Sequence, residues 1–400
     1  MTTLPARAAP PRAARFAVSV MFAIPGIAIG VWTSRIPTLK EQLALGDGQL
    51  SLALLGIAAG ALAGMQVVGR LVDRYGSGRV TVPLAFAQAA VLLLPAAMPN
   101  LAALAAALVV FGVVHGMLDV SMNADAVEVE RAYGRPLMSS FHAVFSLGGF
   151  FGSATGGLFA HAGLAPWPTF AAAAALLAVL AGVASPKLPR SGPHQEEETE
   201  EASGGGGRVR GVLFLGVLGF CCMIGEGASA DWGSVYLRED LASSAGFAAA
   251  AYAAFSIMMT AGRLAGDRLA ARLGPVLLVR CCGTLAGAGL ITALLVGHPV
   301  AGVIGFGCFG AGLSCIVPQV FSAAGNRDPA RAGQALARVA SLGYLGFLTG
   351  PVLIGAVSEA LGLPRALAIP ALLALFVALA APAVRATPAR TAAARERAGR

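Results

Sequence analysis

The chain has 400 residues, of which 57% are hydrophobic and only 12% are charged, and its mean hydropathy is +0.75. Soluble domains are about half apolar and about a quarter charged, so this chain cannot cover a water-facing surface with polar side chains. The composition excludes a soluble globule, a disordered chain and a nucleic-acid-binding domain, despite the formal net charge of +8. It leaves a lipid bilayer as the solvent.

Apolar stretches long enough to cross a membrane recur along the whole chain. A membrane helix needs roughly 20 such residues to span about 30 Å of hydrocarbon. We expect twelve spans, near 15–36, 50–69, 79–98, 101–122, 138–160, 167–185, 212–236, 245–264, 275–296, 299–322, 336–357 and 365–385. Most connections are short, so neighbouring helices run antiparallel. The predicted fold is an all-α polytopic membrane protein.

The basic residues fall almost entirely in alternate connections. All but four of the 28 lysines and arginines lie at the two termini or in the connections that follow every second span. The exceptions are Arg35, Lys40, Arg238 and Arg365. Basic loops remain on the cytoplasmic side of a membrane. We therefore expect both termini in the cytoplasm.

Span one carries an aromatic residue and a basic residue at its outer end. Trp32 and Arg35 lie about one helical turn apart and could stack on and clamp a ligand. Anchoring at the membrane interface is the simpler interpretation of such a pair. Both residues are candidates for the lining of a substrate cavity.

The connection between spans two and three combines glycines with charges. Gly69 would allow another helix to approach closely, and Gly76 would permit a tight turn. Asp73 could meet a helix N-terminus or an arginine across the interface between two bundles. The alternative is a plain basic loop, with Arg74 and Arg79, in which one acid balances the charge.

Span four contains ionisable side chains, which are costly in hydrocarbon and usually mark a pathway. His115, Asp119 and Asn123 are spaced four apart and share one face of the helix. His115 and Asp119 can pair and could relay a proton. The alternative is a helix end that dips into cytoplasmic water, which suits Asn123 best. His142, near the inner end of span five, is a further cavity candidate.

The longest hydrophilic stretch, 186–211, separates two similar parts of the chain. Its run of glutamates followed by glycines cannot bury a core and is typical of a flexible cytoplasmic linker. We place an N-terminal six-helix bundle at 1–185, a C-terminal six-helix bundle at 212–385 and a basic cytoplasmic tail at 386–400.

Span seven carries Glu226 close to the expected membrane midplane, with Asp231 and Trp232 further out. No basic residue in this span can neutralise Glu226, so we interpret it as a lone carboxylate that takes up and releases a proton, as a symport site requires. A permanently protonated side chain that bonds a neighbouring helix is the alternative. Asp231 lies on another face of the helix, where it would pair with Arg35 or face outer water.

Short patterns of the first half recur in the second half at offsets of 193 to 196 residues. The second copy of the charged loop supplies Asp267 and Arg268, but it carries an extra residue and lacks a basic cluster after Gly274. Matches in the same order indicate two pseudo-symmetric halves. In span ten, Gln319 follows Pro318, which could interrupt the helix and free backbone groups toward a cavity.

The layout and the 69–79 loop resemble the major facilitator superfamily of transporters. The pattern similar to that family's signature loop is Gly69, Leu71, Asp73, Arg74, Gly76 and Arg79. The resemblance implies two six-helix bundles related by an axis along the membrane normal, and alternating access to a midplane cavity lined by spans one, four, seven and ten. Spans two, five and eleven would line the contact between the bundles. Their glycines, spaced four apart, would give sliding surfaces.

Further segments resemble a bacterial inner-membrane branch, the YbjJ-like transporters, near the fucose permeases. They are Gly30-x-Trp32-x-Ser34-Arg35-Ile36-Pro37, Ser140-Phe141-His142 and Glu226-Gly227 with Ala230-Asp231-Trp232. Fucose permeases are proton–sugar symporters with carboxylates in spans one and four. Here span four has Asp119 and span one has no acid, which moves the expected proton coupling to Glu226. The resemblance implies the bacterial inner (plasma) membrane and names no substrate.

We therefore predict a secondary transporter of a small solute and not an enzyme. Proton coupling is the expected energy source, since the chain has no Walker-type phosphate loop for using ATP. We expect a monomer in the lipid bilayer with no cofactor, no metal site and no nucleic-acid partner. The alternatives are an efflux antiporter for an apolar compound, a non-transporting membrane sensor and a membrane-embedded enzyme. An enzyme would need a paired nucleophile and base or a metal cluster, which His115 and Asp119 alone do not supply.

Overall fold

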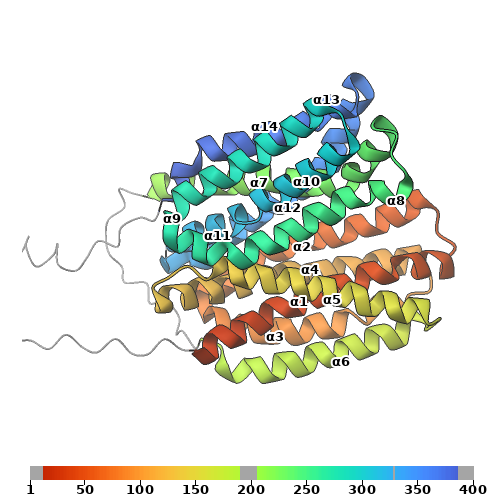
Figure 1. Ribbon diagram of the computed structural model, residues 1–400. Helices are drawn as coiled ribbons and strands as arrows, with labels where there is room; N and C mark the ends of the chain where they lie inside the picture. The colour runs from red at the N-terminus through yellow and green to blue at the C-terminus, as the bar shows by residue number, and fades with distance from the viewer. Residues whose placement is uncertain (1–11, 190–204, 328, 386–400) are drawn as a thin grey trace, which may run out of the picture.

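The computed structural model describes residues 12–189, 205–327 and 329–385, which form helices joined by short connections (Figure 1). The helices are α1 Arg12–Gln42, α2 Asp47–Tyr75, α3 Ser77–Val91, η1 Leu94–Ala97, α4 Leu101–Tyr133, α5 Met138–His161, α6 Pro166–Ala184, η2 Ser185–Lys187, α7 Gly205–Val235, η3 Tyr236–Asp240, α8 Ala245–Ala248, α9 Ala250–Val296, α10 Pro299–Leu313, α11 Ile316–Arg327, η4 Pro329–Arg331, α12 Ala332–Leu361, α13 Leu363–Ala366, α14 Ala368–Leu379 and η5 Ala381–Val384. Among the described residues, ten helical segments are long and apolar enough to cross a membrane, and Leu363–Leu379 is a shorter apolar one. The predicted all-α architecture is confirmed.

The longest helix, α9, joins two of the predicted spans into a run of 47 residues. At about 1.5 Å per residue it would be about 70 Å long, which is more than twice the hydrocarbon thickness of about 30 Å. The run is interrupted at Gly274, whose φ of 74° and ψ of 161° lie outside the helical region, and Pro275 follows. Gly76, between α2 and α3, has a similar conformation, with φ 86° and ψ 146°. The chain therefore turns at Gly274 as it does at Gly76 (Figure 1).

The predicted span near 299–322 is broken into α10 and α11. Helix α10 ends at Leu313, and α11 begins at Ile316. Pro318 lies in the first turn of α11, where its ring would clash with the carbonyl group four residues earlier if the helix were continuous. The expected interruption of this span is present and lies just before the proline.

The two halves of the chain pack their helices in the same way. In the first half, residues 12–189, α1 packs against α5 and α6, while α2 and α3 pack against α4. In the second half, residues 205–385, α7 packs against α12, and α9 packs against α10 and α14. Contacts between the halves run mainly from α2 to α12 and from α5 to α9. Figure 1 shows these helices side by side along the middle of the molecule.

Glycines lie where helix backbones approach each other. A Cβ atom on Gly60 would stand 2.1 Å from the main-chain oxygen of Val109, and one on Gly346 would stand 2.3 Å from that of Phe220. The predicted close approach is present, but the expected sliding surface is not formed by these glycines. Gly60 faces α4 and Gly346 faces α7, both within their own half, because each half must first pack its own helices. Across the halves, it is Gly69 of α2 that meets α12.

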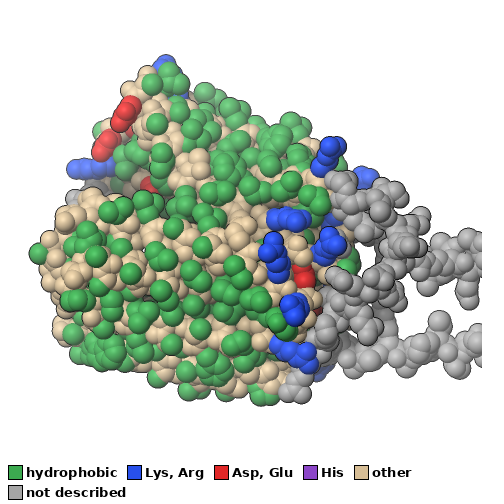
Figure 2. Space-filling model, turned by 180° about the vertical axis from the view of Figure 1, so that it is seen from behind, with side chains coloured by type: hydrophobic (Ala, Val, Ile, Leu, Met, Phe, Trp, Pro, Cys, Tyr) green, Lys and Arg blue, Asp and Glu red, His purple; other side chains and the backbone are tan. Residues whose placement is uncertain are grey.

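Lysine and arginine side chains gather at one end of the molecule (Figure 2). This basic end is the end at which α2 meets α3, α4 meets α5 and α11 meets α12. Near it the Lys187 ammonium lies 5.3 Å from the centre of the Phe16 ring, and Arg327 donates to the carbonyl oxygen of Ala383 over 3.4 Å. Phe16 is close to the first described residue and Ala383 is close to the last. The first and last described residues therefore both lie near the basic end.

Candidate functional site

Three polar side chains from α4 and α5 bond to one another inside the molecule. The amide of Asn123 donates to the carboxylate of Asp119 over 3.3 Å and to the Asp119 carbonyl over 2.8 Å. The Oδ1 atom of Asn123 lies 3.3 Å from Nε2 of His142. The His142 ring is packed between Phe22 of α1, with centroids 5.4 Å apart, and Phe321 of α11, at 5.8 Å. Asn123 is therefore the link between the predicted residues of spans four and five.

A second group joins α5, α7 and α9. The guanidinium Nη2 of Arg263 lies 3.8 Å from the Oε2 atom of Glu226, with side-chain exposures of 9% and 27%. The Nη1 atom of Arg263 donates to Ser146 Oγ over 2.6 Å. Glu226 is therefore not the lone carboxylate that was predicted. Arg263, which the sequence pattern assigned to a basic loop, lies inside the molecule because α9 continues past the expected end of the span at residue 264 and is interrupted only at Gly274.

The two groups meet on α5. Ser146 Oγ accepts from Arg263 and donates to the main-chain oxygen of His142 over 3.1 Å. The connected residues, which we name the central polar chain, are Asp119, Asn123, His142, Ser146, Arg263 and Glu226. This chain runs from α4 through α5 and α9 to α7, so it links the first half of the protein to the second.

His115 is buried but does not join the central polar chain by a hydrogen bond. Its ring stacks on Phe111 with centroids 5.8 Å apart and an interplanar angle of 13°. Its Nδ1 atom has no hydrogen-bond partner in the part of the chain that the structure describes. The predicted pairing of His115 with Asp119 is not formed in the structure, because Asp119 bonds to the amide of Asn123 on its other side.

Trp32 and Arg35 lie away from the central polar chain. Both are buried. Trp32 packs on Phe170 of α6 with centroids 6.4 Å apart, and Arg35 donates to the carbonyl oxygen of Leu164 between α5 and α6. The outer end of α1 turns these side chains toward α6, so the structure does not place them beside the other cavity candidates.

The remaining candidates of the second half are dispersed. Asp231 is exposed, and among the described residues it forms no ion pair with Arg35. The indole of Trp232 donates to the carbonyl oxygen of Pro351 over 3.0 Å and so ties α7 to α12. Gln319 is buried in α11.

The two signature aspartates cap helices of the opposite half. Asp73 accepts from the main-chain N–H groups of Gly333, over 2.7 Å, and Gln334, over 3.2 Å, in the first turn of α12. Asp267 accepts from those of Ser139, over 2.9 Å, and Ser140, over 3.2 Å, in the first turn of α5. A carboxylate at a helix N-terminus satisfies free N–H groups and opposes the positive end of the helix dipole. The contact predicted for Asp73 is present, and Asp267 repeats it.

The other signature residues support these caps. Gly69 packs against α12, where a Cβ would lie 2.9 Å from the carbonyl oxygen of Gly333, and Gly76 makes the turn into α3. The Arg74 guanidinium lies 5.4 Å from the centre of the Tyr75 ring. Arg79 and Arg268 are exposed at the basic end.

Two residues at the end of α4 were not singled out from the sequence. Glu130 accepts from the main-chain N–H groups of Leu137 and Met138, over 2.8 and 3.0 Å, and from the Ser322 hydroxyl of α11. Arg131 donates to Asn326 Oδ1 over 2.6 Å and to the Gly325 carbonyl. A sequence signal for Arg131 is its recurrence in the second half as Arg327, 196 residues later. Together with the aspartate caps, these contacts form a polar latch at the basic end.

Hydrogen bonds join the two described halves in this latch, in the central polar chain and in the pair Gln66–Ser341, at 2.9 Å. The halves are therefore fastened on the side of the basic end.

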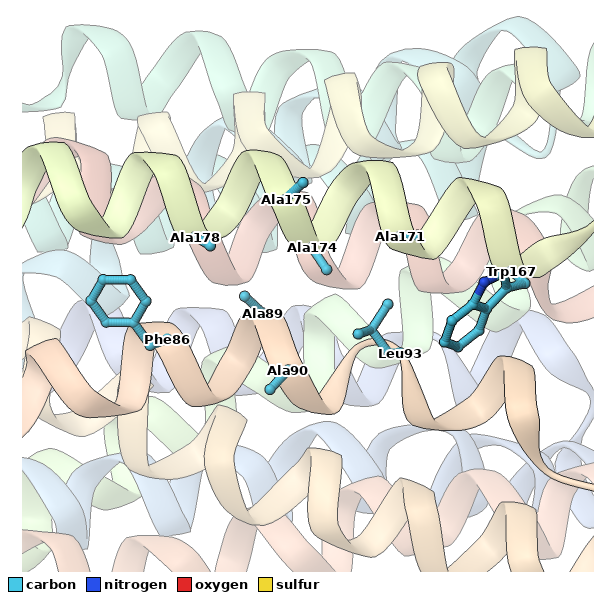
Figure 3. Close-up of a pocket in the computed structure, with 9 residues that line it drawn as sticks. All are labelled: Phe86, Ala89, Ala90, Leu93, Trp167, Ala171, Ala174, Ala175 and Ala178. Atoms are coloured by element: carbon cyan, nitrogen blue, oxygen red, sulfur yellow. The ribbon is translucent and has the colours of Figure 1, made fainter.

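An open groove between α3 and α6 is apolar (Figure 3). It has a volume of about 370 Å³, with Phe86 and Trp167 at its two ends and Leu93 and alanines between them. It lies on the outer surface of the first half and contains no ionisable side chain. The groove is suited to contact with lipid chains. None of its lining residues belongs to the central polar chain.

Comparison with known proteins agrees with this architecture. The model of the Major Facilitator Superfamily matches residues 13–332 and 215–400. An uncharacterized MFS-type transporter of Yersinia pestis is 34% identical over 344 residues, which cover 86% of this chain and 88% of the relative. The membrane protein MosC of Rhizobium meliloti is 33% identical over 359 residues, covering 88% and 85%.

Solved structures of low sequence identity share the fold. The transporter FucP in its outward conformation superposes with a TM-score of 0.77 at 18% identity, covering 93% of this chain and 98% of that one. The human organic anion transporter MFSD10 superposes with a TM-score of 0.75 at 16% identity, covering 94% and 100%. The fold and the relatives define a multi-pass membrane transporter and not an enzyme. The chain belongs to the major facilitator superfamily.

Proposed function

We propose that this protein is a proton-coupled secondary transporter of a small polar solute that works by alternating access. The observation that carries the proposal is the Glu226–Arg263 ion pair, at 3.8 Å, which is linked through Ser146, His142 and Asn123 to Asp119. It joins protonatable groups of both halves in the interior of a membrane transporter. Intramembrane ionisable groups are expensive and are usually kept for a pathway.

The proposed topology has twelve membrane helices. The ten apolar segments become twelve when α9 is counted as two helices that meet at Gly274 and Leu363–Leu379 is counted as the last. We place the basic end in the cytoplasm of a bacterium, because basic loops are retained there, and with it both termini. The proposed units are the bundles 1–185 and 212–385, the linker 186–211 and the tail 386–400, in a monomer of the inner membrane.

The proposed coupling acts through the charge of Glu226. With Glu226 ionised, its carboxylate neutralises Arg263, which also holds Ser146 of the other half. When Glu226 takes up a proton, this attraction is lost and Arg263 becomes available to a hydroxyl, carbonyl or carboxyl group of the solute. Solute binding and proton binding would thus act on the same guanidinium, which is what coupling requires.

The latch at the basic end defines the proposed conformational change. Asp73, Asp267, Glu130 and Arg131 fasten the halves on the cytoplasmic side, so this structure corresponds to a state closed toward the cytoplasm. Opening that side requires both aspartates to leave their helix N-termini. The central polar chain would then face the cytoplasm.

The test is solute-driven proton current after reconstitution in proteoliposomes. Thermal-shift screening of purified protein against sugars, sugar acids, amino acids and drugs first selects compounds that bind. Stabilising compounds are then applied to protein-containing and protein-free membranes on an electrode. We expect a polar solute to evoke a current that depends on the protein. Stabilisation by apolar drugs alone, or binding without current in either direction, would contradict the proposal.

A further inference from the structure

A cationic cavity lies at the basic end, outside the central polar chain and the latch. It has a volume of about 440 Å³. Its lining is Arg12, Arg15, Phe16, Ser19, Tyr133 and Arg135. The first turns of α1 supply one wall, and the turn between α4 and α5 supplies the other. Two helix ends far apart in sequence therefore build one polar cavity.

Three arginines line the cavity, and the described residues that line it include no acid. The guanidinium groups of Arg15 and Arg135 lie 6.0 and 5.6 Å from the centre of the same ring, that of Tyr133. Among the described residues no carboxylate forms an ion pair with Arg12, Arg15 or Arg135. Arg12 and Arg15 also lie in the first turn of α1, which contains no acid and where the helix dipole disfavours cations. An anion in the cavity would relieve both repulsions.

The surroundings indicate an amphiphilic anion. Phe16, on the wall of the cavity, is 51% exposed, and the Lys187 ammonium lies 5.3 Å from the centre of its ring. An exposed aromatic ring beside a group of cations matches a molecule with a charged head and an apolar tail. In membrane proteins, basic pockets between helices on the cytoplasmic side bind the head groups of anionic lipids.

We propose that this cavity binds the phosphate group of an anionic phospholipid. Arg15 and Arg135 hold the phosphate from opposite walls, Arg12 and the Tyr133 hydroxyl add donors at its edge, and Phe16 contacts the acyl chains. The lipid thereby ties the start of α1 to the turn that follows Arg131. Inorganic phosphate has the same charged group but no tail, so it would lack the contact with Phe16.

The test measures lipid binding by native mass spectrometry of the delipidated, full-length protein. The probes are phosphatidylglycerol, phosphatidylcholine with the same acyl chains, and inorganic phosphate. We expect one phosphatidylglycerol molecule to bind first, and the double variant Arg15→Gln/Arg135→Gln to weaken that binding about tenfold or more. Arg272→Gln/Arg338→Gln removes two exposed arginines elsewhere and is expected to leave this first binding step unchanged.

Melting temperature and elution volume of both double variants show whether the protein remains folded. Equal loss of binding in the two double variants would overturn the proposal, because it would show attraction by overall charge. Equal binding of phosphatidylcholine would also overturn it, and binding of inorganic phosphate as tight as that of the lipid would overturn the assignment to a lipid. If Arg15→Gln/Arg135→Gln fails to fold, the single variant Arg135→Gln, at an exposed position, is measured in its place. The expected loss of phosphatidylglycerol binding is then smaller.

Discussion

Asp73 of α2 and Asp267 of α9 make the same contact in opposite directions across the molecule. Each lies in the part of a helix nearest the basic end in one half and accepts two main-chain N–H groups from the first turn of a helix in the other half. The internal repeat thus produces two reciprocal caps at the basic end. Opening that end must break both, so each cap contributes to the stability of the closed state.

Replacing Asp73 by Asn is expected to weaken one cap. The amide keeps an acceptor but loses the negative charge opposite the α12 N-terminus, a change of about 1 kcal/mol. This corresponds to a roughly fivefold shift toward the state open at the basic end. The measurement is the labelling rate of a single cysteine introduced at Ser322, in a background that lacks the native cysteines. Asp240→Asn, an exposed acid at the opposite end, is the control, and equal labelling of the two variants would contradict the role of the cap.

Much of the fold could be predicted because its signals are local. Apolar runs, the glycine spacing and the repeat of the charged loop are patterns along the chain. The cap made by Asp73 was predictable for the same reason, since a conformational role follows from its place beside Gly76. A turn between the predicted spans 245–264 and 275–296 was predictable in the same way, and the structure places it at Gly274.

The centre of the site could not be predicted, because it depends on contacts between distant helices. Glu226 lies on α7 and Arg263 on α9. No pattern in either segment shows that these two surfaces face each other. Arg263 also resembled a loop residue, since its counterpart Arg70 is exposed in the first half. Trp32 and Arg35 fit the pattern of a binding pair, but the direction in which α1 presents them is decided by packing against α6.

Alanine at Gly60 is expected to destabilise the protein. Its Cβ would stand 2.1 Å from the carbonyl oxygen of Val109, so α2 and α4 must move apart, at a cost of about 1 to 3 kcal/mol. The control is Gly157→Ala in α5, where a Cβ would meet nothing within 4 Å and helix propensity favours alanine by about 0.5 to 1 kcal/mol. Melting in detergent should give a lower temperature for Gly60→Ala and an equal or higher one for Gly157→Ala. The same change in both would mean that the close approach is unimportant.

Removing one partner of the Glu226–Arg263 pair is expected to cost more than removing both. Arg263→Gln leaves a largely buried carboxylate without its cation, whereas Glu226→Gln/Arg263→Gln leaves two neutral side chains. A coupling on the order of 1 kcal/mol is expected for a pair that is partly exposed. Melting temperatures of the two single variants and the double variant supply the cycle. Additive shifts would show that the two charges do not interact.

The most direct test of the proposed coupling compares Glu226→Gln with Asp231→Asn in proteoliposomes. The second variant removes an exposed acid from the same helix and serves as the matched control. With a solute that evokes current in the parent protein, we measure uptake driven by a pH gradient and exchange of labelled for unlabelled solute at equal pH. The prediction is that Glu226→Gln loses gradient-driven uptake and retains exchange, while Asp231→Asn retains both. Undiminished gradient-driven uptake by Glu226→Gln would contradict a role for Glu226 in proton coupling.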